Sequence, residues 1–248
     1  MSDSVYVYGV LAAADAASLT TSGVMGSPVR AVQSGDLAAL VSDVAGGALA
    51  AAREVRAHWR VLESASKQTT VLPVRFGTVM EDDDAVREQL LADGAERLTA
   101  LLQELTGRVQ LTVRGTYDEE ALLRGVVAGS GEIAALRERV LRMPEAAAYY
   151  DRIQLGELIA GEVQRRREAD AALAQERLAP CAVAVREEAT GRDGAFHLAF
   201  LVERDRIDAF SAAVTDLTAE LGDRVAIRYV GPLAPYSFAE AELAAGAA

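Results

Sequence analysis

The chain has 248 residues, half of them apolar and a quarter charged, which is typical of folded globular proteins and sufficient for two modest domains. Acidic residues outnumber basic ones by 37 to 25, and the net charge of −12 argues against a protein that binds nucleic acid or anionic membranes through a basic surface. The single cysteine, Cys181, allows no intrachain disulfide, and no stretch approaches about 18 uninterrupted apolar residues, so we expect a cytoplasmic protein without a membrane span.

Predicted strands and helices alternate along the first half of the chain. Val5–Leu11 is rich in β-branched and aromatic residues and predicts a strand, and the alanine-rich residues 12–22 fit a short helix. Two apolar runs, Val29–Gln33 and Leu37–Val44, flank the turn sequence Ser34-Gly35-Asp36 and predict a hairpin. A helix over 48–67 and a strand over 69–79 complete the order βαββαβ, which is that of the ferredoxin-like arrangement.

Two features of the predicted helices in this half are specific enough to check. In the helix over 48–67, apolar and small residues recur at helical spacing and are expected on one face, with charges opposite: Val55, Trp59, Leu62 and Ser66. A second helix is expected to run without interruption from Glu81 to Thr106, and Gly107 ends it.

The second half repeats the same order, with extra helices after its first strand. Strands are predicted at 109–116, 182–187, 195–202 and 225–230, and helices at 118–127, 132–142, 144–178 and 205–221. The last helix has one apolar face, formed by Ile207, Phe210, Val214, Leu217 and Leu221. We therefore predict an α+β protein of two ferredoxin-like (βαββαβ) domains: residues 1–106, ending in a linker helix, and residues 107–248, with inserted helices and a C-terminal tail.

Three segments of the chain resemble a known family. They are Val5-Tyr6-Val7-Tyr8-Gly9-Val10, Leu72-Pro73-Val74-Arg75-Phe76-Gly77-Thr78-Val79 and Gly231-Pro232-Leu233-Ala234-Pro235-Tyr236-Ser237-Phe238. In order and spacing they are similar to the GvpF/GvpL family of gas vesicle accessory proteins, over almost the whole chain. Family members often carry a further proline and a bulky aromatic residue before the proline-tyrosine pair, where this chain has Ala234 and Leu233.

The resemblance implies two ferredoxin-like domains, a cytoplasmic and gas vesicle associated protein, and no enzymatic activity. The family is thought to contact the small hydrophobic shell protein, of the GvpA type, during nucleation or early assembly. We expect a non-enzymatic assembly factor, without a cofactor, that binds this shell subunit through its N-terminal domain and also meets other gas vesicle accessory proteins. The alternatives are a minor structural component of the finished vesicle and a small-ligand-binding or enzymatic ferredoxin-like protein.

Arg75 is the most unusual residue in these segments, because an arginine in an apolar strand is rarely buried without a partner. It either pairs with an acidic residue of a neighbouring element and fixes the strand, or it contacts a partner protein directly. Gly77 is expected to let the backbone bend or let another chain approach closely. Tyr6, Tyr8 and Phe76 are the other candidate contact residues of the N-terminal domain.

The tail sequence after the last predicted strand has two interpretations. Gly231-Pro232 and Pro235-Tyr236 either form a turn from which Tyr236 and Phe238 dock the tail onto the body, or they present an exposed aromatic hook to a partner. The candidate residues of the tail are therefore Pro232, Pro235, Tyr236 and Phe238.

No pattern in the sequence indicates catalysis or metal binding. The acidic run Glu81–Asp84 is explained by capping and by the dipole at a helix start, and His58 and His197 do not lie at metal-ligand spacing. No nucleophile-elbow sequence is present. We therefore predict no catalytic, cofactor-binding or metal-binding residues.

Overall fold

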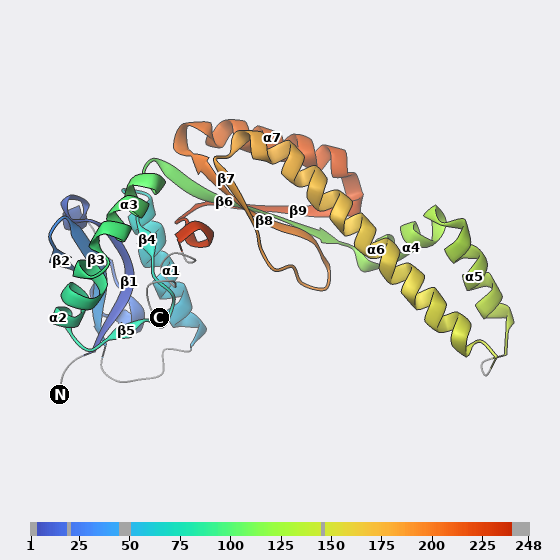
Figure 1. Cartoon of the computed structure of the whole chain (residues 1–248), viewed down its shortest axis with the longest axis horizontal. Coiled ribbons are helices and arrows are strands. Elements are labelled where there is room, and N and C mark those ends of the chain that lie inside the picture. The colour runs from blue at the N-terminus through green and yellow to red at the C-terminus, as the bar shows by residue number, and fades with distance from the viewer. Residues whose placement is uncertain (1–3, 19–20, 45–50, 145–146, 240–248) are drawn as a thin grey trace. The chain divides into compact units, whose positions relative to one another are not determined.

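The computed structural model describes residues 4–18, 21–44, 51–144 and 147–239, which form a mixed helix and sheet protein, as predicted (Figure 1). The chain divides into two compact units. Unit 1 comprises Met1–Leu111, Leu201–Arg204 and the chain from Gly231 onward, and unit 2 comprises Thr112–Phe200 and Asp205–Val230. The tail, which the sequence assigned to the second domain, thus belongs to unit 1.

Unit 1 is built on a sheet with the strand order β2-β3-β1-β4, in which the short β5 also pairs with β1. Its strands are β1 (Ser4–Ala12), β2 (Arg30–Ser34), β3 (Leu37–Val44), β4 (Leu72–Pro73) and β5 (Val79–Met80). The predicted hairpin is confirmed, because Ser34 pairs with Leu37 across a two-residue turn whose Gly35 has a φ of 57°. The stretch between β1 and β2 carries 3₁₀ turns, η1 (Ala13–Ser18) and η2 (Val24–Gly26), where a short helix was predicted.

The central strand β1 is buried on both faces of this sheet. All residues from Val5 to Leu11 are buried, so the alternation expected of a half-exposed strand is absent. The helix α1 (Ala52–Ser66) contacts β1, while the π-helical turn η3 (Val86–Ala92) and α3 (Ala95–Leu105) contact strands β1 to β3. Figure 1 shows α1 on one side of these strands and α3 on the other.

The prediction of a single strand over 69–79 is wrong. Both β4 and β5 pair with β1, with Pro73 opposite Gly9 and Val79 opposite Tyr6, but residues 75–77 leave the ladder between them. A turn closes this excursion, because the Thr78 amide and hydroxyl both donate to the carbonyl of Arg75, at 3.2 and 2.8 Å. Gly77 has a φ of 92°, a backbone conformation that glycine adopts at little cost.

The helix predicted from Glu81 to Thr106 is interrupted. It consists of α2 (Asp83–Ala85), η3 and α3, and its start is capped by the Asp82 carboxylate, which accepts from the Ala85 amide at 2.8 Å. Gly94 separates η3 from α3, and a Cβ at this position would lie 2.7 Å from the carbonyl oxygen of Leu90. The close approach of the chain to itself at Gly94 explains why the helix breaks there.

Most of the second sheet lies in unit 2, with the strand order β7-β8-β6-β9. Its strands are β6 (Arg108–Tyr117), β7 (Ala184–Glu187), β8 (Gly194–Glu203) and β9 (Val225–Leu233). The inserted helices are present as α4 (Glu119–Gly129), α5 (Gly131–Arg142) and α6 (Tyr149–Leu178), and α7 (Ile207–Leu221) follows β8. In both sheets the third strand lies between the first and second, which is the pairing that the order βαββαβ predicts.

The core of unit 2 lies between its sheet and α7. Four of the five residues of the predicted apolar face are buried, namely Phe210, Val214, Leu217 and Leu221, while Ile207 at the start of the helix is half-buried. The ring of Phe210 packs edge-on against Phe200 of β8, with centroids 5.0 Å apart. Figure 1 shows α6 and α7 on the same side of this sheet.

Candidate functional site: an aromatic cluster around His58

The three segments that carry the family resemblance meet within unit 1 at one side chain, His58 of α1. Tyr6 comes from β1, Phe76 from the excursion between β4 and β5, and Tyr236 from the C-terminal tail. Their ring centroids lie 5.7, 5.6 and 6.4 Å from that of His58. We call His58, Tyr6, Phe76, Tyr236 and the adjoining Trp59 the His58 cluster.

Both ring nitrogens of His58 have a tyrosine partner. Nδ1 lies 2.8 Å from the Tyr6 hydroxyl, and Nε2 lies 2.6 Å from the Tyr236 hydroxyl. The ring is fully buried, and burial lowers the pKa of His58 to about 4, an effect that the carbonyl of Val74 only partly offsets. The imidazole is therefore neutral at physiological pH, with one nitrogen accepting and the other donating.

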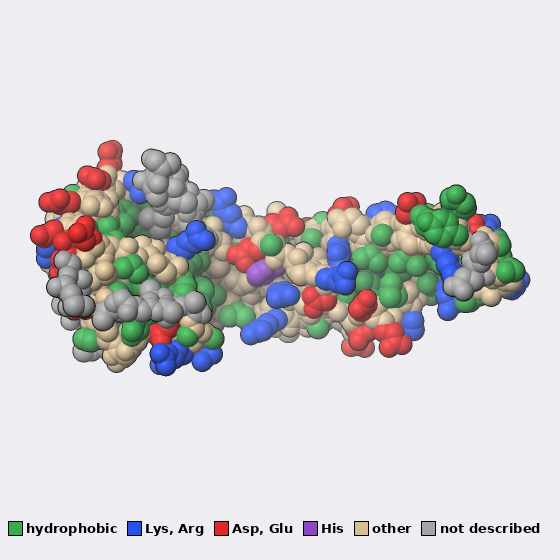
Figure 2. Space-filling model, turned by 90° about the horizontal axis from the view of Figure 1, so that it is seen from below, with side chains coloured by type: hydrophobic (Ala, Val, Ile, Leu, Met, Phe, Trp, Pro, Cys, Tyr) green, Lys and Arg blue, Asp and Glu red, His purple; other side chains and the backbone are tan. Residues whose placement is uncertain are grey.

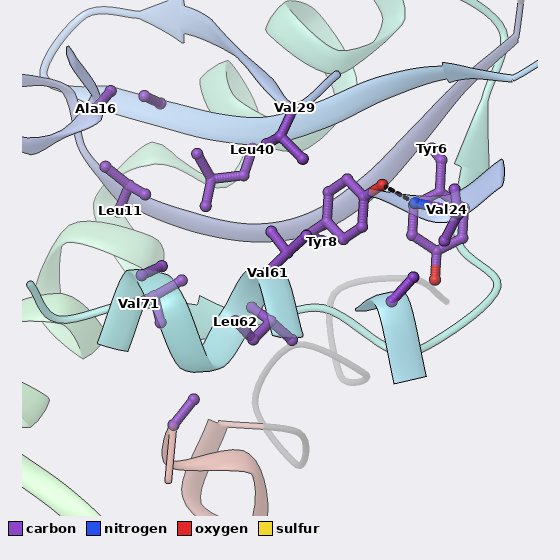
Figure 3. Packing of buried hydrophobic residues seen from close by; sticks show 14 of the residues in the cluster. Tyr6, Tyr8, Leu11, Ala16, Val24, Val29, Leu40, Val61, Leu62 and Val71 are labelled. Atoms are coloured by element: carbon purple, nitrogen blue, oxygen red, sulfur yellow. Dashed lines mark hydrogen bonds between the residues drawn. The ribbon is translucent and has the colours of Figure 1, made fainter. Parts of the chain in front are cut away.

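Tyr6 and Tyr8 are core residues whose hydroxyl groups are fully used. The Tyr6 hydroxyl also accepts from the Gly77 amide at 3.1 Å, which fixes the excursion, and burial raises the pKa of Tyr6 to about 12. Tyr8 lies at a bulge in the pairing of β1 with β3; its hydroxyl donates to Ser42 Oγ at 3.0 Å and accepts from the Val24 amide at 2.8 Å (Figure 3). Neither tyrosine is available to a partner without opening this core.

Arg75 does not form the salt bridge that the sequence suggested. Its side chain is exposed, and among the described residues it forms no ion pair. The reason is the excursion, which takes residues 75–77 out of the ladder and turns Arg75 away from the core while Phe76 packs inward. Of the two interpretations of Arg75, the structural one is therefore wrong, and contact with a partner stays a prediction.

The C-terminal tail packs against unit 1 as the first of its two interpretations describes, but Gly231-Pro232 lie within strand β9 and not in a turn after it. Pro235 and Phe238 are buried, and the half-buried Tyr236 packs on Trp59 with ring centroids 4.4 Å apart. The Ser237 amide donates to Gln110 Oε1 at 2.9 Å. Pro232 is exposed, so the four candidate residues of the tail do not share one surface.

The sequence did not identify His58 or Trp59 as members of this cluster. Val55, Trp59, Leu62 and Ser66 were expected on the buried face of α1, but Trp59 is 43% exposed and Val55 is only half-buried. Leu62 and Ser66 are buried as expected, and the rest of the buried face is formed by Glu54, Ala57, His58, Val61 and Ala65. Glu54 and His58 can lie on this face because each has hydrogen-bond partners. In the sequence, the spacing of Ala57, Val61 and Ala65 was the signal that indicated this face.

The His58 cluster combines hydrogen-bonded buried groups with exposed apolar surface. The buried groups are neutral or hydrogen-bonded, and no group of three His, Cys, Asp or Glu residues in the described part of the chain can hold a metal ion. None of the described helices is both long and apolar enough to cross a bilayer. Trp59 and Val79 of β5 are each about two-fifths exposed, so the cluster and the neighbouring sheet edge offer apolar surface to solvent.

Comparison with known proteins identifies the family. The family model for the gas vesicle synthesis proteins GvpL/GvpF matches residues 4–240. The chain belongs to the GvpL/GvpF family. Gas vesicle protein F of Streptomyces sp. (strain CB03234) is 37% identical over 240 residues, covering 96% of this chain and all of that protein. Gas vesicle protein L of the same strain is 32% identical, covering 88% of this chain and 85% of that protein.

Solved structures of relatives have the same fold as this GvpL/GvpF chain. The crystal structure of GvpF from Anabaena sp. PCC7120 superposes with a TM-score of 0.83 at 27% identity, covering 96% of this chain and 98% of that one. The structure of GvpF from Microcystis aeruginosa gives a TM-score of 0.80 at 26% identity, with 95% and 98% coverage. The His58 cluster therefore belongs to a gas vesicle-related protein, and it brings together side chains that are far apart in the sequence.

Proposed function

We propose that this GvpL/GvpF protein is a non-enzymatic accessory protein of gas vesicle assembly, located in the cytoplasm and associated with the vesicle. It binds the hydrophobic shell subunit, of the GvpA type, during nucleation or early assembly. The binding surface is the edge of unit 1 formed by residues 75–80. The observation that supports this proposal is the exposed edge strand β5 beside an aromatic cluster that holds it in place.

The edge of the sheet at β5 has the properties of an apolar docking strand. Within the described part of the chain β5 pairs only with β1, so its outer edge is free, and Val79 is 42% exposed on it. An extended apolar segment can add to such an edge through backbone hydrogen bonds while side chains contact the neighbouring surface. Arg75 and the partly buried Phe76 flank this edge and supply a charge and a ring to the same partner.

The two-domain organisation is part of the proposal. The strand order of both sheets supports two ferredoxin-like units, with residues 1–106 and 107–248 as the corresponding halves of the sequence. Because the tail from Gly231 packs in unit 1, the full-length chain is the appropriate material for testing which unit binds the shell subunit.

Co-purification with the shell subunit from a co-expressing host tests the proposal. We expect Val79→Asp to abolish co-purification, because a charge blocks an edge strand, and Arg75→Glu to weaken it. Leu141→Asp is the matched control: Leu141 is 70% exposed on α5 of unit 2, and its substitution is expected to leave binding unchanged. If Leu141→Asp loses binding and Val79→Asp keeps it, the assignment of the binding surface to unit 1 is contradicted. A different result, a fixed ratio of this protein to the shell protein in washed vesicles, favours the alternative that it is a structural component of the vesicle.

A further inference from the structure

The outward face of α1 is basic, although the protein as a whole is acidic. The exposed residues Arg53, Arg56 and Arg60 are spaced three and four positions apart and therefore lie along one face of the helix. The chain carries 37 acidic and 25 basic residues, so three exposed arginines on one helix face are unusual here. Figure 2 shows a group of basic side chains at the lower margin of unit 1, with acidic side chains beside it.

The acidic residues of α1 neutralise this face only at Arg53. Glu54 is buried, and its carboxylate accepts from the Met25 amide and from Arg53 Nε, both at 2.6 Å. Glu63 binds Lys67 at 2.8 Å. Arg56 and Arg60 form no ion pair with any residue that the structure describes. Two guanidinium groups on one helix face are thus left for a partner.

A cavity adjoins the arginine face. Its volume is about 380 Å³, and its lining includes Ser22, Met25, Arg53, Glu54, Ala57 and Arg60. Met25 has a φ of 54°, the only positive φ among the described residues other than glycine, and its amide is held by the buried Glu54 carboxylate. The cavity is therefore shaped by a fixed backbone, and two arginine side chains border it.

The arginine face continues into an apolar surface. Trp59 follows Arg56 by three positions and is neighbour to it on the helix, and its ring is supported from behind by Tyr236 at 4.4 Å. Arginine and tryptophan are the side chains that most often contribute strongly to protein interfaces, especially where a rigid ring lies beside a charge. This combination fits a segment that carries both carboxylates and an apolar side chain.

We propose that the outer face of α1 binds an acidic, amphipathic segment of a partner protein. One of its carboxylates pairs with Arg60, which borders the cavity, a second pairs with Arg56 on the same helix face, and an apolar side chain covers Trp59. Arginine recognises carboxylates through paired N–H donors, which gives such contacts both strength and geometry. A protein segment is favoured over an anionic membrane or nucleic acid because the net charge of −12 repels an extended polyanion while a short acidic segment meets only the local face. The site is separate from the β5 edge assigned to the shell subunit.

The fluorescence of Trp59 tests this proposal, because Trp59 is the only tryptophan in the chain. The probe is a synthetic helical peptide with glutamates on one face and leucines on the other, titrated into the full-length protein. We expect a blue shift of the tryptophan emission and an affinity that falls as salt rises. The same peptide with glutamine in place of glutamate is expected to bind at least about tenfold more weakly.

Charge reversal on the arginine face provides the specific comparison. R56E/R60E is expected to weaken binding of the peptide by about tenfold or more. The control is R206E/R228E, which makes the same change in net charge at exposed positions of unit 2. This control variant is expected to bind the peptide within about twofold of the wild type. R56Q/R60Q serves if the charge-reversed protein does not fold. Equal binding of the glutamine peptide, equal weakening by both double variants, or the same emission shift with inorganic phosphate alone overturns the proposal. Co-purification of the shell subunit is a separate readout, so the two surfaces can fail independently.

Discussion

The Tyr236 hydroxyl lies 2.6 Å from Nε2 of His58, and this contact joins the C-terminal tail to the first helix of unit 1 across 178 positions of sequence. The other nitrogen of the same ring meets Tyr6 of the first strand. One imidazole therefore connects the beginning of the chain, the excursion fixed by Tyr6 and the tail. The stability of unit 1 is expected to depend on this ring and on its two tyrosine partners.

Removing the Tyr236 hydroxyl tests the contribution of the tail contact. Tyr236→Phe keeps the ring on Trp59 but leaves a buried nitrogen of His58 without this partner, so we expect the free energy of unfolding to fall by about 1–2 kcal/mol. Urea denaturation measures the change. Tyr150→Phe is the control, because Tyr150 is 81% exposed, and equal stability of the two variants contradicts the assigned role.

The buried His58 predicts that stability depends on pH. Its pKa is about 4 in the folded protein, against an ordinary value of 6.5, so the unfolded chain binds the proton more tightly. The stabilisation from keeping the ring neutral is present above pH 6.5 and is lost as the pH falls from 6.5 toward about 4, with a total of at most about 3 kcal/mol.

Denaturation of the wild type and of His58→Gln at about pH 7.5 and about pH 5 isolates this effect. Acidic groups titrate in both proteins, so the difference between the two pH profiles reports His58 alone. We expect a steeper loss of stability in the wild type than in His58→Gln. Parallel profiles for the wild type and His58→Gln rule the explanation out.

Arg75 and Arg30 are expected to differ in their importance for folding. Arg75 is exposed and unpaired among the described residues, so Arg75→Ala is expected to change the free energy of unfolding by less than about 0.5 kcal/mol. Arg30 donates to both carboxylate oxygens of Asp83, at 2.9 and 2.8 Å, and also pairs with Asp43, so Arg30→Ala is expected to cost about 1 kcal/mol. Denaturation of the two variants side by side checks the order, and a larger loss with Arg75→Ala reverses it.

Unit 2 has its own buried polar contact, at Asp170 of α6. Its carboxylate accepts from the Tyr117 hydroxyl at 2.7 Å and from Arg224 Nη2 at 2.7 Å, and burial together with Asp170 raises the pKa of Tyr117. Asp170→Ala removes both contacts and is expected to cost about 2–3 kcal/mol, whereas Tyr117→Phe removes one and is expected to cost about 1 kcal/mol. Thermal unfolding provides the comparison, and a Tyr117→Phe loss that matches Asp170→Ala contradicts this order.

Local sequence patterns predicted most of the secondary structure. The β2–β3 hairpin followed from Ser34-Gly35-Asp36, and the buried face of α7 followed from the spacing of Phe210, Val214 and Leu217. These predictions succeeded because the residues that determine each element lie within it. The inserted helices between β6 and β7 were found for the same reason.

Long-range contacts explain what the sequence could not predict. His58 and Glu54 read as polar residues for the outside of α1, but partners from distant elements satisfy them inside the core. The sequence did not predict that residues 75–77 leave the sheet, because an apolar run with one arginine also fits a continuous strand. Its turn depends on Tyr6, which holds the Gly77 amide from another strand.

The return of the chain to unit 1 has a consequence for how the protein is made. Residues Gly231 to Ala239 complete the His58 cluster, yet the ribosome adds them only after all of unit 2 has been synthesised. Until then, a nascent unit 1 has its sheet and helix α1 but leaves the Tyr236 face of His58 and Trp59 open. The apolar surface around this cluster is therefore closed only after the last segment of unit 2 has been synthesised.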